Sequence, residues 1–122
     1  MPDGSGPLDH DTLSMLLDQP PELVRELMSL FVCDAQEQLA AIPPLVEARD
    51  GPALQRLLHR LKGGCLAVGA NLMAERCRVL EAWALAGEIS AFDSGLPLLE
   101  AEFRETRDAL GAQNLLDDTG SS

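Results

Sequence analysis

The sequence predicts an all-α protein, an antiparallel four-helix bundle with a short additional N-terminal helix. Apolar residues recur at three- and four-residue spacing along most of the chain, and no segment alternates as a strand would. Short connections rich in Gly, Pro and Asp separate these amphipathic segments, which makes neighbouring helices antiparallel. With 122 residues, 46% of them hydrophobic, the chain can bury one core. We therefore expect a single domain.

The N-terminal part should begin with a flexible tail over residues 1–7, which are rich in turn formers. A short helix is expected from about Asp9 or Asp11 to Leu17, with an apolar side formed by Leu13, Leu16 and Leu17. Residues 18–20 end this helix and lead into the next one.

The second helix is expected from Pro21, or the residue after it, to about Ile42. Pro43 and Pro44 should kink or stop it, because a proline has no N–H and disfavours helix at the residue before it. Residues 45–48 should then continue after a kink. The inward stripe is predicted to contain Leu23 or Val24, Leu27, Leu30 or Phe31, Asp34, Ala35 and Leu39.

The third helix should occupy most of residues 50–70, with Asp50 as N-cap and Pro52 in its first turn. Its core face is predicted to consist of Leu54, Leu57, Leu58, Leu61, Cys65 and Val68. At about 100° per residue, His59 points roughly 150° away from that face, so it should be exposed to solvent.

A fourth helix is expected from about Asn71 to Ala86, ended by Gly87. A fifth should run from about Ser90 to Leu110, although Gly95 and Pro97 could delay its start to near Ser94. Residues 8–111 then form the bundle, and residues 112–122 are expected to be a disordered tail.

The outer face of the third helix combines four unusual features. The chain's one lysine, Lys62, follows His59 at a spacing that lets the two side chains meet. No Asp or Glu occurs from Gly51 to Ala74. Gly63 and Gly64 each cost a helix about 1 kcal/mol relative to alanine, and Leu66 is apolar yet points outward. An anion held at the imidazole and a closely docking partner would explain this combination.

These residues resemble the signature H-x-L-K-G-(x5)-G-A of histidine-containing phosphotransfer (HPt) domains, in the run His59-Arg60-Leu61-Lys62-Gly63 followed by Gly69-Ala70. Residues 26–31 with 34–35, 71–72 with 77–81, and 100–103 are similar to the family's second, next and last helices. The resemblance covers roughly residues 8–111. The family's second helix usually runs straight on to the Gly-Asp turn, so Pro43 and Pro44 are a departure from its pattern.

The resemblance implies a carrier that takes a phosphoryl group from a receiver-domain aspartate onto His59 and passes it to another receiver. The implied partners are the receiver domains of a hybrid sensor histidine kinase and of a response regulator. The chain itself needs no cofactor, and the magnesium belongs to the partner's acidic pocket. Lys62 is the expected stabiliser of the phosphoryl oxygens, with Gln55, Arg56 and Arg60 as lesser contributors. The expected docking residues are Arg56, Arg60, Gly63, Gly64 and Leu66.

Other classes of function are disfavoured by the composition. A net charge of −11 opposes binding to nucleic acid, and neither a membrane-spanning run nor a signal peptide is recognisable. Three cysteines without C-x-x-C spacing read as small buried hydrophobes of a cytoplasmic protein. With two histidines and no thiolate pair, a zinc site is not expected. Without a phosphate-binding glycine loop or a carboxylate cluster for magnesium, the chain should not phosphorylate itself from ATP.

Plainer interpretations remain beside this one. Taken alone, His59, His10, Lys62 and the arginines would be ordinary surface residues. Gly64 is as consistent with helix packing as with docking, and Gly69 is more typical of a helix C-cap than of a contact residue.

The alternative function is a non-catalytic helical adaptor that binds a receiver or kinase domain. The His59–Lys62 pair argues against it, because an adaptor has no reason to display that pair. The N-terminal Met and the two tails favour a free-standing monomer. The sequence does not name the kinase, the regulator, the pathway or the direction of phosphoryl flux.

Overall fold

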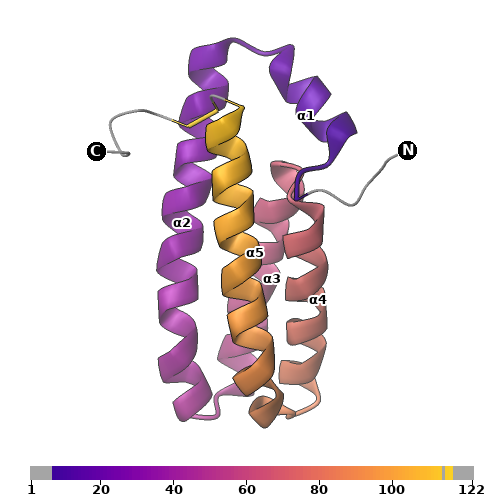
Figure 1. The fold of residues 1–122 in the computed structure, drawn as a ribbon. Coiled ribbons are helices and arrows are strands. Elements are labelled where there is room, and N and C mark those ends of the chain that lie inside the picture. The colour runs from indigo at the N-terminus through magenta and orange to yellow at the C-terminus, as the bar shows by residue number, and fades with distance from the viewer. Residues whose placement is uncertain (1–6, 114, 117–122) are drawn as a thin grey trace.

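Four long helices lie side by side in alternating directions, and a short fifth helix crosses one end of them (Figure 1). The computed structural model describes residues 7–113, 115 and 116. The short helix is α1 (His10–Leu17), and the bundle consists of α2 (Pro21–Glu47), α3 (Gly51–Ala67), α4 (Asn71–Leu85) and α5 (Phe92–Ala112). A single 3₁₀ turn, η1 (Ile89–Ala91), precedes α5. The described residues contain no strand, and the predicted fold class is confirmed.

Helix α2 runs through its two prolines to Glu47. Of the two predicted outcomes, a kink or a stop, the stop at Ile42 is therefore wrong, and the predicted continuation after the prolines is confirmed as far as Glu47. The amide of Ala48 still donates to the Pro44 carbonyl at 3.0 Å, which is ordinary helical bonding beyond both rings. Pro43 and Pro44 are exposed, so their rings face solvent and do not displace side chains of the core. Ile42 is fully buried. Packing of the inner face therefore outweighs the two lost hydrogen bonds.

The structure shows which of the alternative apolar residues of α2 face the core. Val24 and Phe31 are buried, whereas Leu23, Leu27 and Leu30 are exposed. The predictions that Leu27 and Asp34 lie inward are wrong, because both residues are exposed. The core side of α2 is centred on Val24, Met28, Phe31, Ala35 and Ile42. Three leucines consequently remain on one flank of this helix.

The turns between the helices are formed by the residues that the sequence indicated. Asp50 caps α3 by accepting a hydrogen bond from the Ala53 amide at 3.1 Å. Gly69 has a φ of 80° and follows the end of α3, which confirms it as a C-cap residue. Gly87 has a φ of 77° and follows α4. Both glycines adopt a backbone conformation that residues with a Cβ rarely reach.

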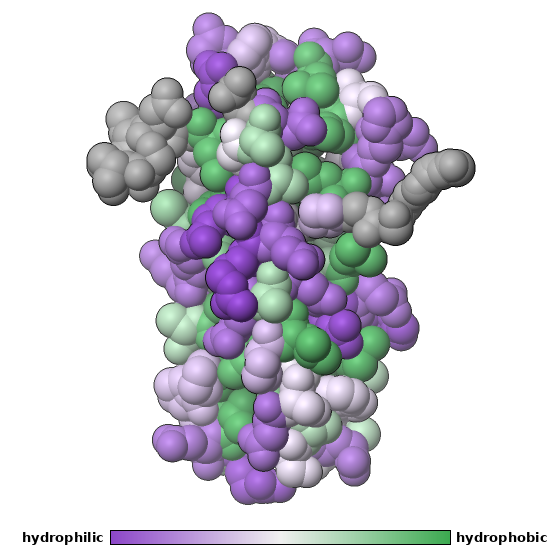
Figure 2. Space-filling model, in the orientation of Figure 1, coloured by the Kyte–Doolittle hydropathy of each residue, from purple (hydrophilic) through white to green (hydrophobic). Residues whose placement is uncertain are grey.

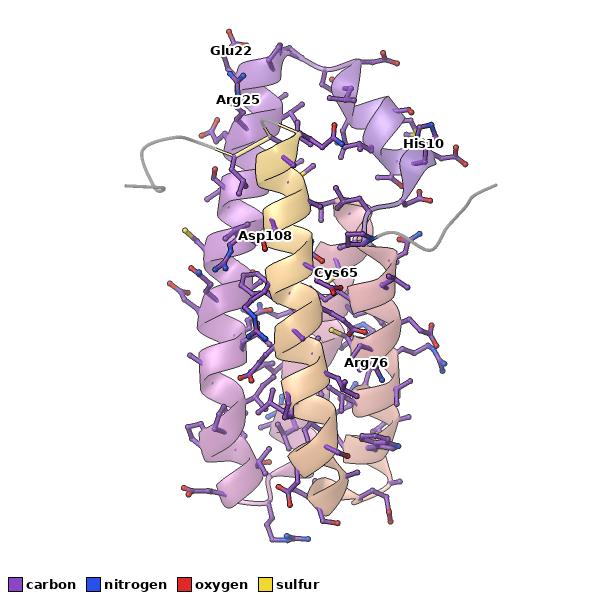
Figure 3. The ribbon with its side chains drawn as sticks, viewed as in Figure 1. His10, Glu22, Arg25, Cys65, Arg76 and Asp108 are labelled. Carbon is purple, nitrogen blue, oxygen red and sulfur yellow. The ribbon has the colours of Figure 1, made fainter. Side chains whose placement is uncertain are left out.

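The core holds two of the three cysteines. Cys65 of α3 and Cys77 of α4 are fully buried, and Figure 3 shows Cys65 among the packed helices. Cys33 is exposed, so its predicted burial is wrong; it lies on the side of α2 opposite the core. Helices α4 and α5 are also linked by Arg76, which donates two hydrogen bonds of 3.1 Å to Glu102 (Figure 3). Polar side chains cover much of the face over α5 (Figure 2).

The first turns of α5 are regular despite Gly95 and Pro97, and the helix begins at Phe92 rather than near Ser94. Gly95 is buried where α5 crosses α4. A Cβ on this residue would lie 2.5 Å from Leu80 Cδ2 and 2.8 Å from Trp83 Cζ3. The glycine therefore allows the two helices to approach closely.

Replacing Gly95 with alanine should lower the free energy of unfolding by about 1–3 kcal/mol, because Leu80 is fully buried and cannot move aside. The matched control is Gly63→Ala, since no atom lies within 4 Å of a Cβ built there. That variant should raise helix stability by about 1 kcal/mol. Urea unfolding followed by circular dichroism would measure both. Equal stability of the two variants would contradict the close-packing account.

The segment that precedes α1 joins that helix to the turn after α3. Asp9 caps α1 by accepting hydrogen bonds from the Thr12 amide at 3.0 Å and the Thr12 hydroxyl at 2.6 Å, and its own amide donates to the Gly69 carbonyl. Leu13 and Leu16 pack against the core as predicted, but Leu17 is exposed.

The predicted C-terminal tail begins too early. Ala112 is still helical, and Leu115, only 4% exposed, is buried in the core. An apolar residue this close to the end of α5 can fold back over the bundle and be buried there. The rest of the two predicted tails, residues 1–6, 114 and 117–122, lies outside the described residues. No helix in the described part of the chain is both long and apolar enough to cross a membrane.

Candidate functional site

His59 is displayed on the outer face of α3, as predicted. Its side chain is 65% exposed, while Leu58 and Leu61 on either side of it are buried in the core. The leucine stripe thus fixes the rotation of α3, and that rotation points the imidazole outward.

A carboxylate from the neighbouring helix lies at the centre of the site. Glu81 of α4 accepts hydrogen bonds from Gln55 Nε2 at 2.7 Å and from Lys62 Nζ at 3.0 Å. Its Oε2 atom also lies 3.0 Å from His59 Nδ1. The three partners occur at positions 55, 59 and 62 of α3, a spacing that places them on one flank of a helix. Glu81 therefore gathers three of the predicted site residues on one buried group.

Glu81 remains ionised although its side chain is only 11% exposed. Burial alone would raise the pKa of this carboxyl group, but hydrogen bonds from Gln55, Lys62 and His59 outweigh it and hold the pKa below its ordinary value of 4.5. An ionised carboxylate can only accept hydrogen bonds. The Nδ1 atom of His59 must then carry the hydrogen, which in a neutral imidazole leaves the Nε2 lone pair free.

The expectation that the surroundings of His59 are free of acidic groups is wrong. The third helix itself contains no Asp or Glu, but Glu81 reaches His59 from α4. The sequence did carry a signal for this residue. Glu81 follows Cys77 by four residues, which places a carboxylate in the inward stripe of a helix that is otherwise apolar there. A buried carboxylate requires partners, and an adjacent helix with a lysine and a histidine could supply them.

Lys62 is held by an ion pair that the sequence did not predict. Its ammonium group is paired with Glu81, and its side chain is 24% exposed. Since Lys62 and His59 share the same carboxylate, the ammonium group is held beside the imidazole. A negatively charged group bound at His59 Nε2 would lie near this cation.

The remaining predicted site residues lie around His59 without touching it in any recorded contact. Arg56, Arg60 and Leu66 are exposed on α3. Gly63 is exposed, and nothing in the described part of the chain lies within 4 Å of a Cβ placed there. Gly64 instead faces α2, where its Cβ would lie 3.7 Å from the Phe31 ring. That distance is an ordinary van der Waals contact, so the packing against α2 would also accept an alanine at Gly64, whereas Gly63 leaves an open surface.

Two exposed leucines of α2 extend this surface. The contact between Phe31 and Gly64 shows that α2 borders the outer face of α3 at this level. Leu27 lies one turn before Phe31, and Leu30 immediately precedes it. Both leucines lie on the side of α2 that faces α3. The sequence analysis missed them, because exposed leucines and core leucines look alike in an apolar stripe.

The arrangement as a whole suits nucleophilic chemistry on an anionic electrophile. It offers a largely exposed imidazole that is held through Nδ1, a carboxylate that orients the ring, and a nearby ammonium group. Within the described residues, no three His, Cys, Asp or Glu side chains come together in a group that could hold a metal ion.

Comparisons with known proteins agree with this geometry. The family model described as Hpt domain matches residues 26–111. The structure is similar to that of histidine-containing phosphotransfer protein B (HptB) from Pseudomonas aeruginosa PAO1, with a TM-score of 0.84 and 29% sequence identity over 89% of this chain and 95% of that one. No curated protein sequence matches the chain. The matched region contains α3, α4 and nearly all of α2 and α5, including every residue that contacts Glu81. The chain therefore belongs to the Hpt domain family.

Proposed function

We propose that the chain is a histidine phosphocarrier in a multistep phosphorelay. His59 accepts a phosphoryl group from an aspartate on the receiver domain of a hybrid sensor histidine kinase and passes it to the receiver domain of a response regulator. The observation that carries this proposal is the solvent-facing Nε2 of His59, with Nδ1 held by Glu81 and Lys62 on the same carboxylate.

The transfer step follows from these contacts. The Nε2 lone pair of His59 forms a bond to phosphorus as the bond between phosphorus and the aspartate oxygen breaks, and the aspartate leaves as a carboxylate. The hydrogen on Nδ1 stays in place, so the ring becomes positively charged. Glu81 stabilises that charge, and Lys62 stabilises the phosphoryl oxygens. Since phosphoryl transfer depends mainly on positioning and electrostatics, these groups suffice on the carrier's side.

The chain requires no cofactor of its own under this proposal, and magnesium is supplied by the receiver's acidic pocket. Such a pocket is attracted by the outer face of α3, which carries Arg56 and Arg60 and no carboxylate. Most of the rest of the protein is acidic, with a net charge of −11. The charge distribution therefore orients an acidic partner toward His59. We place this exchange in the cytoplasm.

The docking surface comprises Arg56, Arg60, Gly63 and Leu66 of α3, extended by Leu30 of α2. A receiver must bring its aspartate to bonding distance of a group on His59, so the two backbones must approach closely beside it. Gly63 lies only about 40° from His59 around the helix, and Leu66 about 20° on the other side.

The variants Gly63→Gln and Leu66→Ala should weaken receiver binding while the bundle stays folded. A long side chain at position 63 would obstruct the partner, and the loss of Leu66 would remove apolar contact area, each costing about 1–2 kcal/mol of binding free energy. Titration calorimetry with a receiver domain measures this loss. Leu85→Ala is the control, because Leu85 is also an exposed leucine but lies at the far end of α4. Normal binding by Gly63→Gln would contradict this docking surface.

Incubation with a panel of receiver domains phosphorylated on aspartate tests the function itself. We expect at least one receiver to transfer its phosphoryl group to the chain and produce a linkage that is labile in acid and stable in base, as expected of phosphohistidine. Binding of receivers without any transfer would favour the adaptor function instead.

A further inference from the structure

A groove runs between α2 and α3, on the flank of α3 opposite Glu81, and His59 is not among the residues that line it. It has a volume of about 480 Å³, and its walls include Asp34, Glu37 and Gln38 of α2 and Arg56, Leu57 and Arg60 of α3. Arg60 follows His59 directly, and Arg56 precedes it by three residues. Arg60 points about 100° and Arg56 about 60° away from His59 around α3, so a partner that covers His59 and spreads toward α2 also covers this groove.

The two walls of the groove carry opposite charge. Asp34 and Glu37 are on the α2 wall, and Arg56 and Arg60 are on the α3 wall. No ion pair between these four residues occurs among those recorded for the described chain. The opposite charges of the two walls are thus not paired across the groove, and the charged side chains of each wall remain available to a partner.

The α2 wall also contains an unsatisfied polar group. Gln38 is only 6% exposed, and its Nε2 atom donates to Asp34 Oδ2 at 3.2 Å. Its Oε1 atom is buried, and no donor in the described part of the chain bonds to it. A buried carbonyl oxygen without a protein donor favours a hydrogen bond from water or from a partner's donor. Two acceptors, the Asp34 carboxylate and the Gln38 carbonyl, therefore lie together on this wall.

We propose that the α2 wall of this groove receives a cationic side chain, lysine or arginine, from the docked receiver domain. This inference rests on the proposed function and names a contact that selects the partner. The cation pairs with Asp34 and Glu37 and replaces Gln38 as the donor to Asp34. The released Gln38 amide then turns outward, and its oxygen accepts a hydrogen bond from the same cation. Arg56 and Arg60 repel that cation from the α3 wall and leave their own charge for the acidic pocket opposite His59.

Three variants test the contact in the full-length chain. Gln38→Met removes the buried amide with little change in shape, and Asp34→Asn removes the charge. Gln36→Met is the matched control, because Gln36 is exposed on the same helix and points about 160° away from Gln38. The readouts are the dissociation constant of the unphosphorylated receiver, its dependence on salt, and the midpoint of thermal unfolding.

We expect Gln38→Met and Asp34→Asn to weaken receiver binding about tenfold, the effect of losing one hydrogen bond to a charged group. The thermal midpoint of Gln38→Met should not fall, because the variant removes an unsatisfied buried group. Asp34→Asn should also flatten the salt dependence, and Gln36→Met should bind normally. Normal binding by both groove variants, or equal weakening by the control, overturns the proposal.

The same measurements in a His59→Gln background separate this inference from the proposed function. Binding does not need the reacting nitrogen, so the groove variants should weaken it there as well. If no receiver transfers phosphate but binding still depends on Gln38 and Asp34, the carrier function fails and the cation site stands. If transfer occurs and the groove variants bind the receiver normally, only the proposed cation site is wrong.

Discussion

His59→Gln is expected to abolish the acid-labile phosphoryl label while the bundle remains folded. Glutamine has no nitrogen lone pair of comparable nucleophilicity, so no bond to phosphorus can form at this position. The side chain is 65% exposed, and among the described residues Glu81 is its one recorded partner. A glutamine amide can still donate to that carboxylate. The free energy of unfolding should therefore change by no more than about 0.5 kcal/mol.

Transfer from a phosphorylated receiver to each variant, followed by acid and base treatment, measures the effect. His10→Gln is the control, because His10 is exposed at the start of α1. That variant should be labelled like the wild type. A label that persists in His59→Gln and disappears in His10→Gln would move the phosphorylation site to α1. A label lost in His59→Gln together with the helical signal would say only that the variant is unfolded, so circular dichroism accompanies the assay.

The sequence predicts those features of the site that depend on α3 alone. The leucine spacing of residues 54–61 fixes which way α3 faces, so the exposure of His59 follows from the sequence alone. Contacts between helices were not predictable in the same way. Glu81 is 22 residues from His59, and only the packing of α4 against α3 brings the two together. The spacing of apolar residues predicts which side of a helix faces the core. It does not predict which residues of two neighbouring helices lie opposite each other.

The errors in the fold have a related cause. Local preference predicted that Pro43 and Pro44 would kink or stop the helix, but burial of Ile42 and its neighbours on the inner face keeps the chain helical through both prolines. Leu27 was assigned to the core because it is apolar and correctly spaced. Its exposure beside the outer face of α3 is instead consistent with a surface that a partner covers.

Glu81→Ala should lower the rate of phosphoryl transfer about 10- to 100-fold, a loss typical of removing a group that orients a reacting histidine. Without the carboxylate, nothing keeps the hydrogen on Nδ1, and Lys62 and Gln55 lose their shared acceptor. Since Glu81 lies beneath the docking surface, kcat should fall while KM stays nearly constant. Glu81→Gln should recover part of the loss, because its amide oxygen can still accept from Nδ1 although the negative charge is gone.

A purely structural role for Glu81 would give a different pattern. Glu102→Gln is the control, since Glu102 also forms an ion pair between helices, with Arg76, but makes no recorded contact with the site. It should lower stability without changing kcat in the folded protein. If Glu81→Ala raises KM as much as it lowers kcat, or if Glu102→Gln slows transfer equally, then Glu81 does not position His59.

The pH dependence of stability provides an independent measurement on the same variants. The pKa of Glu81 is lowered in the folded protein, so its hydrogen bonds stabilise the fold above the ordinary carboxyl value of 4.5. That contribution is lost as the pH falls below this value and through the lowered pKa. Glu81→Gln has no carboxylate to protonate, so its free energy of unfolding should decline less than that of the wild type over the same acidic range. Identical declines in urea unfolding series would mean that Glu81 is not held ionised by its three partners, and the assignment of the Nδ1 hydrogen would fail with it.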